Sequence, residues 1–139
     1  MTYANNYWVR PATLHPTPLV HHANAPHQSN INSRGPSVRF GTVHIFNNYY
    51  ENISTGAVNT RMGAQVLVES TQFVDVGSPV TSKDSDETGT AALNDVDLGS
   101  GVNDAPEGAP LEVEYEYALL GSGAVREAVV GVAGNTLVF

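Results

Sequence analysis

Two arginines, Arg34 and Arg39, are the residues whose type and spacing point most directly to chemistry. A guanidinium is a planar fork of N–H donors that matches a carboxylate, so the pair predicts binding of an anion and stabilisation of negative charge in a transition state. Acting as a base is more demanding, because a guanidinium has a pKa above about 12 and needs nearby cations and exclusion of water to lose its proton. Residues five apart on a straight strand point to opposite faces, but a bend at Gly35-Pro36 could bring both side chains to one groove.

Other chemically capable side chains are interpreted as structural or solvated. Arg61 is expected to be structural, and His44 to be a hydrogen-bonded histidine rather than a catalytic one. Four histidines lack a recognised metal-ligand spacing: His15, His21, His22 and His27. Six acids do not complete a twelve-residue calcium loop: Asp84, Asp86, Glu87, Asp95, Asp97 and Asp104. No metal ligand is therefore assigned. The sequence Asn52-Ile53-Ser54 is a glycosylation acceptor, which is compatible with secretion.

Composition indicates one globular domain, with 41% apolar and 14% charged residues among 139. The absence of cysteine excludes disulfides and thiolate chemistry. Residues 1–68 hold four arginines and one glutamate, whereas residues 69–139 hold two cations and thirteen acids, within a net charge of −8. Overall acidity disfavours a nucleic-acid partner, while the basic first part could attract an anion. No segment has the pattern of a transmembrane helix or of a secretory signal, and we expect the true N-terminus to lie outside this chain.

One pattern occurs three times, in residues 2–8, 44–53 and 67–76. Tyr50 corresponds to Phe73 at an offset of 23 residues, but Trp8 precedes Tyr50 by 42. A period near 23 with short strands and Asn or Gly turns is typical of a solenoid. The predicted fold is therefore all-β, a partial right-handed parallel β-helix of two to three coils. Residues 9–28 are surplus to the repeat and are interpreted as an irregular insertion, possibly a retained intron.

The predicted organisation places a first coil strand at residues 1–8, the insertion at 9–28 and coils at 29–80. Residues 81–111 are predicted to be an acidic surface loop, with a short strand around Ala91–Leu93. Residues 112–139 are predicted to pack on the β-helix as an extended arm or edge strand followed by a short helix. Ser122 is expected to cap that helix, and its apolar face is expected to consist of Val125, Ala128 and Val129.

The stretch from Asn30 to Ser70 resembles the fungal pectate lyases of polysaccharide lyase family one. The Arg-x-Pro-x-x-Arg signature of that family is present as Arg34-Gly35-Pro36-Ser37-Val38-Arg39, followed by Phe40-Gly41. The resemblance covers residues 2–8 and about 29–139. It implies a secreted enzyme that cleaves polygalacturonate by β-elimination with the help of calcium, with Arg34 as the base and Arg39 as a substrate-binding residue.

The resemblance also implies that much of such an enzyme is missing. The family places its calcium-ligating acids and a substrate-binding lysine on earlier coils, and no residue of this chain matches a calcium ligand. We therefore expect a truncated member of the family, which is poorly soluble and inactive when expressed alone.

Three alternatives remain open. The first is a pectin lyase that acts on methyl-esterified substrate without calcium. The second is a non-catalytic β-solenoid that binds acidic polysaccharide, and the third is a cytosolic structural solenoid. The partner is expected to be polygalacturonate rather than nucleic acid or a membrane, and the chain is expected to be monomeric.

Overall fold

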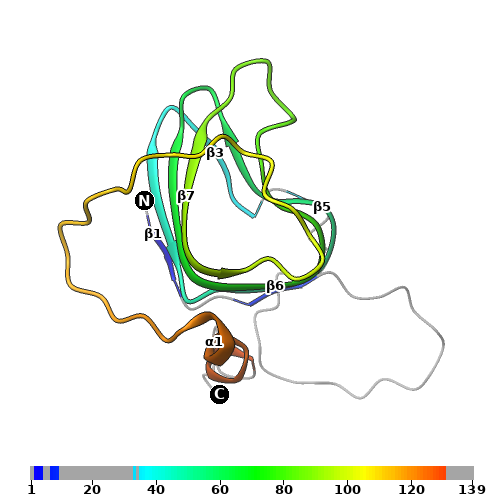
Figure 1. Cartoon of the computed structure of the whole chain (residues 1–139), viewed down its shortest axis with the longest axis vertical. Helices are drawn as coiled ribbons and strands as arrows, with labels where there is room; N and C mark the ends of the chain where they lie inside the picture. The colour runs from blue at the N-terminus through cyan, green and yellow to red at the C-terminus, as the bar shows by residue number, and fades with distance from the viewer. Residues whose placement is uncertain (1, 5–6, 10–32, 34, 131–139) are drawn as a thin grey trace, which may run out of the picture.

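The computed structural model describes residues 2–4, 7–9, 33 and 35–130. The strands in this part of the chain are β1 (Thr2–Ala4), β2 (Tyr7–Val9), β3 (Ser37–Arg39), β4 (Thr42–Phe46), β5 (Tyr49–Arg61), β6 (Gln65–Thr81) and β7 (Thr90–Asp97). One helix, α1 (Ser122–Val129), follows them. The strands curl around a common interior, and α1 lies outside this wall (Figure 1).

Parallel pairing joins all the named strands into one sheet, in the order β1-β4-β6-β5-β2, with β3 on β5 and β7 on β6. Tyr50 is the register partner of Phe73, which confirms the predicted offset. Trp8 is the register partner of Tyr50, so these two strands stack as consecutive coils despite their long separation in sequence. The predicted parallel coils are therefore confirmed. The proposed insertion remains a prediction, because residues 10–32 lie outside the described part of the chain.

Left-handed backbone conformations recur at the same place in successive coils. Asn47, Ser70 and Asp95 have φ values of 53°, 45° and 51°. Each follows an aligned position, because Phe46 pairs with Glu69, which pairs with Asn94. Asn and Asp adopt this conformation more readily than most residues, since their short polar side chains hydrogen-bond locally. The stacked bends turn each coil at the same height.

Aliphatic and aromatic side chains fill the interior of the coils. Ile45, Val68, Ile53 and Val58 are completely buried. In addition, the rings of Tyr50 and Phe73 stack with centroids 4.6 Å apart and an interplanar angle of 12°. Because register partners repeat from coil to coil, apolar inward positions form continuous rows and bury one core.

The expectation of an acidic surface loop at 81–111 is too limited. β7 occupies Thr90–Asp97 and pairs with β6, so the interval contains a further coil strand. The segment after β7 covers part of its outer edge, since Ala91 N donates to Pro106 O (2.9 Å) and Gly108 N donates to Ala91 O (2.9 Å). Small residues such as Ala91 and Ala92 hide a strand that is packed on both faces. Such a strand lacks the alternating pattern used for recognition from sequence.

The arm that precedes α1 carries tyrosines onto the outer face of the sheet. Glu69, on β6, is buried and accepts hydrogen bonds from Tyr117 Oη (2.8 Å), His44 Nε2 (2.9 Å) and Asn94 Nδ2 (2.8 Å). Burial raises the pKa of Glu69, but these hydrogen bonds outweigh it and hold the pKa below its usual value. His44 Nε2 therefore carries the proton in this bond, and Nδ1 of a neutral ring accepts from Tyr115 Oη at 2.6 Å. This confirms His44 as a hydrogen-bonded coil histidine.

The end of the arm is attached to the three stacked bends. The amide of Asn47 brackets the arm, and Ser70 and Asp95 hold the residues just before and at the start of α1. The bonds are Asn47 Nδ2 to Ala118 O (2.8 Å), Leu120 N to Asn47 Oδ1 (3.0 Å), Gly121 N to Ser70 Oγ (2.6 Å), Ser122 N to Asp95 Oδ2 (2.9 Å) and Ser122 Oγ to Asp95 Oδ1 (2.7 Å).

The expected cap of α1 is wrong in detail. Gly121 is the N-cap residue, and the Ser122 hydroxyl bonds to Asp95 of β7 instead of to its own helix. Val125 and Val129 are buried against Tyr49, whereas Ala128 is exposed. The helix is therefore positioned by a carboxylate from another coil, which no local capping pattern could predict.

We predict that Glu69→Gln lowers the free energy of unfolding at neutral pH by about 1–3 kcal/mol, because charge-assisted bonds to a buried carboxylate are lost. A depressed folded-state pKa contributes stability that is present above the unfolded value of 4.5 and is lost as the pH falls through the lower folded value. The difference between the two proteins should therefore shrink below about pH 4.5. Denaturant titration from pH 7 to pH 3 measures it. Glu116→Gln, at an exposed position, is the matched control, and a Glu69→Gln deficit that is constant with pH would contradict the prediction.

Candidate functional site

Of the two predicted site arginines, the structure describes Arg39. It is the last residue of β3, and its side chain is exposed, as is that of Ser37, while Val38 between them faces the core. Arg34 lies outside the described residues, so the predicted shared groove for Arg34 and Arg39 stays a prediction. The peptide bond between Gly35 and Pro36 is cis, and both residues are buried.

Arg39 is the direct register partner of Arg61 on β5. Neighbouring strands are about 4.8 Å apart, so two positive side chains start from adjacent positions of the sheet. No item of side-chain compensation is seen for Arg39 within the described residues, and like charges on neighbouring strands repel each other. A bound anion between or beside the two guanidinium groups would relieve that repulsion.

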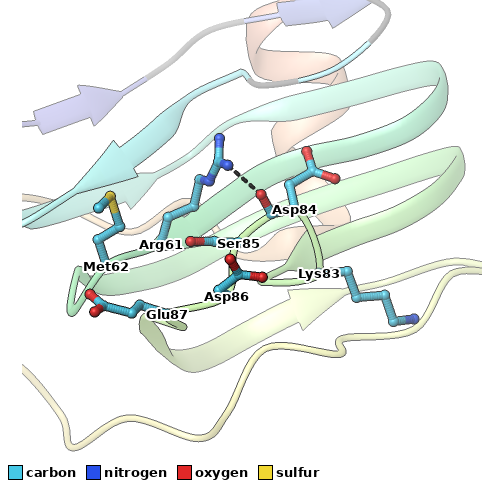
Figure 2. Close-up of a pocket in the computed structure, with 7 residues that line it drawn as sticks. All are labelled: Arg61, Met62, Lys83, Asp84, Ser85, Asp86 and Glu87. Atoms are coloured by element: carbon cyan, nitrogen blue, oxygen red, sulfur yellow. Dashed lines mark hydrogen bonds between the residues drawn. The ribbon is translucent and has the colours of Figure 1, made fainter.

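Arg61 contacts the loop that follows β6. One terminal guanidinium nitrogen donates to the backbone oxygen of Asp84, as Figure 2 shows. The Nε atom of Arg61 is buried and has no hydrogen-bond partner within the described part of the chain. The side chain therefore has the structural contact that was expected and also an unused donor. Its pairing with Arg39 was missed in the sequence, although their separation of 22 residues is close to the coil period.

A groove with a cavity volume of about 610 Å³ opens beside this row of arginines. Its lining residues come from the end of β5 and the loop after β6, and Figure 2 shows them: Arg61, Met62, Lys83, Asp84, Ser85, Asp86 and Glu87. A second pocket of about 320 Å³ shares Lys83 and Asp84 with it and includes Ser33. The predicted signature thus begins and ends near one continuous hollow surface.

The charges along this groove are mixed. Lys83 forms an ion pair with Asp104 at 2.8 Å, but its side chain is 74% exposed. Burial raises the pKa of Asp104, and hydrogen bonds from Lys83, Thr81 and the Ser82 backbone outweigh it, so that the pKa lies below its usual value. Asn59 Nδ2 donates to Asp84 Oδ2 at 3.4 Å. The positive groups at one end and the acids at the other give the groove a polarity.

The acids of this region do not form a calcium site. Among the residues that the structure describes, no group of three or more His, Asp or Glu side chains is arranged to hold a metal ion. Asp104 faces Lys83, Asp95 accepts from Ser122, and Asp97 accepts from Gln72 and from the Gly99 backbone. Calcium needs several converging oxygen ligands, so these residues do not fit the ion.

A family model described as pectate lyase matches residues 18–136. The chain belongs to the pectate lyase family. Pectate lyase B of Colletotrichum gloeosporioides is 50% identical over 139 residues, covering 100% of this chain and 36% of that protein. Probable pectate lyase A of Aspergillus fumigatus has the same identity and the same coverage of both chains. The chain therefore spans about a third of the length of these relatives.

Solved structures of pectate lyases share the fold. Pectate lyase II from Xanthomonas campestris has a TM-score of 0.70 at 28% identity, covering 96% of this chain and 39% of that one. A pectate lyase from Bacillus sp. N165, in complex with trigalacturonate, has a TM-score of 0.68 at 25% identity with the same coverage. The resemblance to pectate lyases is thus confirmed, as is the β-helix class. Within the described residues, no helix has the length and apolar character needed to cross a bilayer.

We predict that Arg39→Gln raises the free energy of unfolding slightly at low ionic strength, on the order of 0.5 kcal/mol, because it removes the repulsion with Arg61. The gain should disappear in high salt, which screens exposed charges. Thermal melting at two salt concentrations measures it. Arg126→Gln is the control with the opposite sign, because Arg126 Nε donates to Tyr49 Oη at 3.3 Å and that contact is lost. A loss of stability in Arg39→Gln at low salt would show that its charge is compensated.

Proposed function

We propose that the chain is part of a secreted lyase that cleaves polygalacturonate by β-elimination. The observation that carries the proposal is the in-register pair Arg39 and Arg61 beside a groove, in a chain of the pectate lyase family. Polygalacturonate carries one carboxylate on each sugar, and arginine forms the strongest bidentate contacts to carboxylates. A row of guanidinium groups along the stacked coils suits a polymer with repeated negative charges.

The reaction removes the proton on C5 of a uronate, next to its carboxylate. The electron pair left on C5 forms the C4–C5 double bond as the C4–O bond breaks, and the leaving oxygen takes up a proton. Negative charge develops on the carboxylate in the transition state, where a preorganised guanidinium lowers the barrier. By the family resemblance, Arg34 is the proposed base and Arg39 binds the carboxylate of the substrate.

Calcium dependence is proposed from the family resemblance alone. The acids that the structure describes do not fit a calcium ion, so no step of the reaction is derived through one. In the longer relatives, the additional two thirds of the protein would have to supply the ligands. Secretion is proposed on the same basis. It is also supported by the glycosylation motif, in which Ser54 is exposed and Asn52 is partly exposed.

A chimera tests the activity. The chain replaces the matching part of the Colletotrichum relative, and the assay follows the ultraviolet absorbance of the unsaturated product. We predict activity on polygalacturonate that decreases as the substrate is methyl-esterified, because esterification removes the charges that the arginines bind. A folded chimera that prefers fully esterified pectin would favour a pectin lyase instead, and a folded chimera with no eliminative activity would contradict the proposal.

Arg34→Lys separates catalysis from binding in the same chimera. We predict a loss of turnover of at least about a hundredfold, because the proposed base is replaced, while affinity for polygalacturonate stays within a few-fold because the positive charge is kept. Turnover by absorbance and affinity by gel electrophoresis in polygalacturonate are the two measurements. Val102→Ala, at a surface position that is 68% exposed, is the matched control. Full turnover in Arg34→Lys would remove Arg34 from the mechanism.

A further inference from the structure

Phe40 has two unfavourable features that its own fold does not explain. Its side chain is 73% exposed, more than any other large apolar side chain in the described part of the chain. Its backbone has φ of 54°, in the left-handed region. A bulky residue at positive φ is a genuine outlier, and exposing a phenylalanine gives up the stabilisation that burial of its ring would bring. Strained, exposed residues of this kind cluster at ligand sites.

The next coil repeats the arrangement. Met62 follows Arg61 as Phe40 follows Arg39, and Met62 also has a positive φ, of 48°. The Phe40 backbone N–H donates to Met62 O at 3.3 Å, so the two residues are neighbours across the coils. Two rows therefore run side by side along the stack, one of arginines and one of apolar side chains. Met62 also lines the 610 Å³ groove, which connects the apolar row to the proposed site.

We propose that Phe40 is a stacking platform for a sugar ring of the polyuronate chain at the rim of this groove. The inference rests on the proposed function and adds a specificity residue to it. A galacturonate unit has an anionic edge and an apolar face of C–H groups. The negative face of an aromatic ring attracts such C–H groups, and ligand sites commonly combine apolar surface with a few placed charges. The arginine row would hold the carboxylate while Phe40 contacts the ring face.

The occupant is inferred from what adjoins Phe40. Arg39 precedes it directly, and the positive side chain of Arg61 lies in register with Arg39 in the next coil. A protein segment packed on Phe40 would have to face this repulsive pair, whereas an acidic sugar satisfies both rows at once. A polyuronate therefore matches the chemistry better than an apolar polypeptide does.

Phe40→Asn tests the platform without disturbing the backbone, because asparagine tolerates the left-handed conformation. In the chimera described above, we expect polygalacturonate binding to weaken about three- to tenfold, with the melting temperature unchanged or raised. Phe40→Tyr, which keeps the ring, should retain most of the affinity. Val102→Ala is the control for the loss of an exposed apolar side chain elsewhere.

The outcomes separate this inference from the proposed function. If the unaltered chimera binds no polygalacturonate, the proposed function fails, and this inference fails with it. If the chimera binds but Phe40→Asn binds equally well, only the platform is overturned. A marked drop in melting temperature for Phe40→Asn would show that the ring is packed by protein, which also overturns the platform. Weaker binding in Phe40→Asn with affinity kept in Phe40→Tyr supports it.

Discussion

In-register parallel hydrogen bonding to β6 is the constraint on which the rest of the structure depends. This strand pairs with β4 and β5 on one side and with β7 on the other, so every coil has to return to the height of its neighbour. Each sequence position is thereby aligned with one position of the next coil. The pairs Tyr50 and Phe73 in the core and Arg39 and Arg61 on the surface both result from this alignment. One rule of register therefore builds the core and the candidate site.

The arm shows how a buried charge is made tolerable. An isolated carboxylate would be costly on a covered sheet face, but Glu69 receives donors from His44, Asn94 and Tyr117. Two of these donors come from neighbouring coils, and the third comes from a segment without regular structure. The network thus replaces strand pairing as the means of attaching the arm. It also makes this attachment specific, since a shifted arm would leave the carboxylate without Tyr117.

Sequence reasoning succeeded where the repeat could be seen and was limited where contacts between coils decide the outcome. The offset from Tyr50 to Phe73 predicted both the coil period and the parallel stack, because bulky core residues mark their rungs clearly. The strand β7 was underestimated, because its alanines and acidic residues resemble a loop pattern. The cap of α1 depends on Asp95 from another coil, and the exposure of Phe40 is visible only in three dimensions. The pairing of Arg39 with Arg61 could have been deduced by applying the same offset to the signature.

Long-range attachment of the arm has a kinetic consequence. Tyr115 meets His44 across 71 residues of sequence, whereas successive rungs meet across about 23 to 25. The entropic cost of closing a chain segment grows with its length, so the rungs assemble before the arm can dock. The outer face of β4 and β6, with its histidine and glutamate, would then be wetted in any half-assembled species. Recognition of that species by chaperones would concentrate on this face rather than on the interior of the coils.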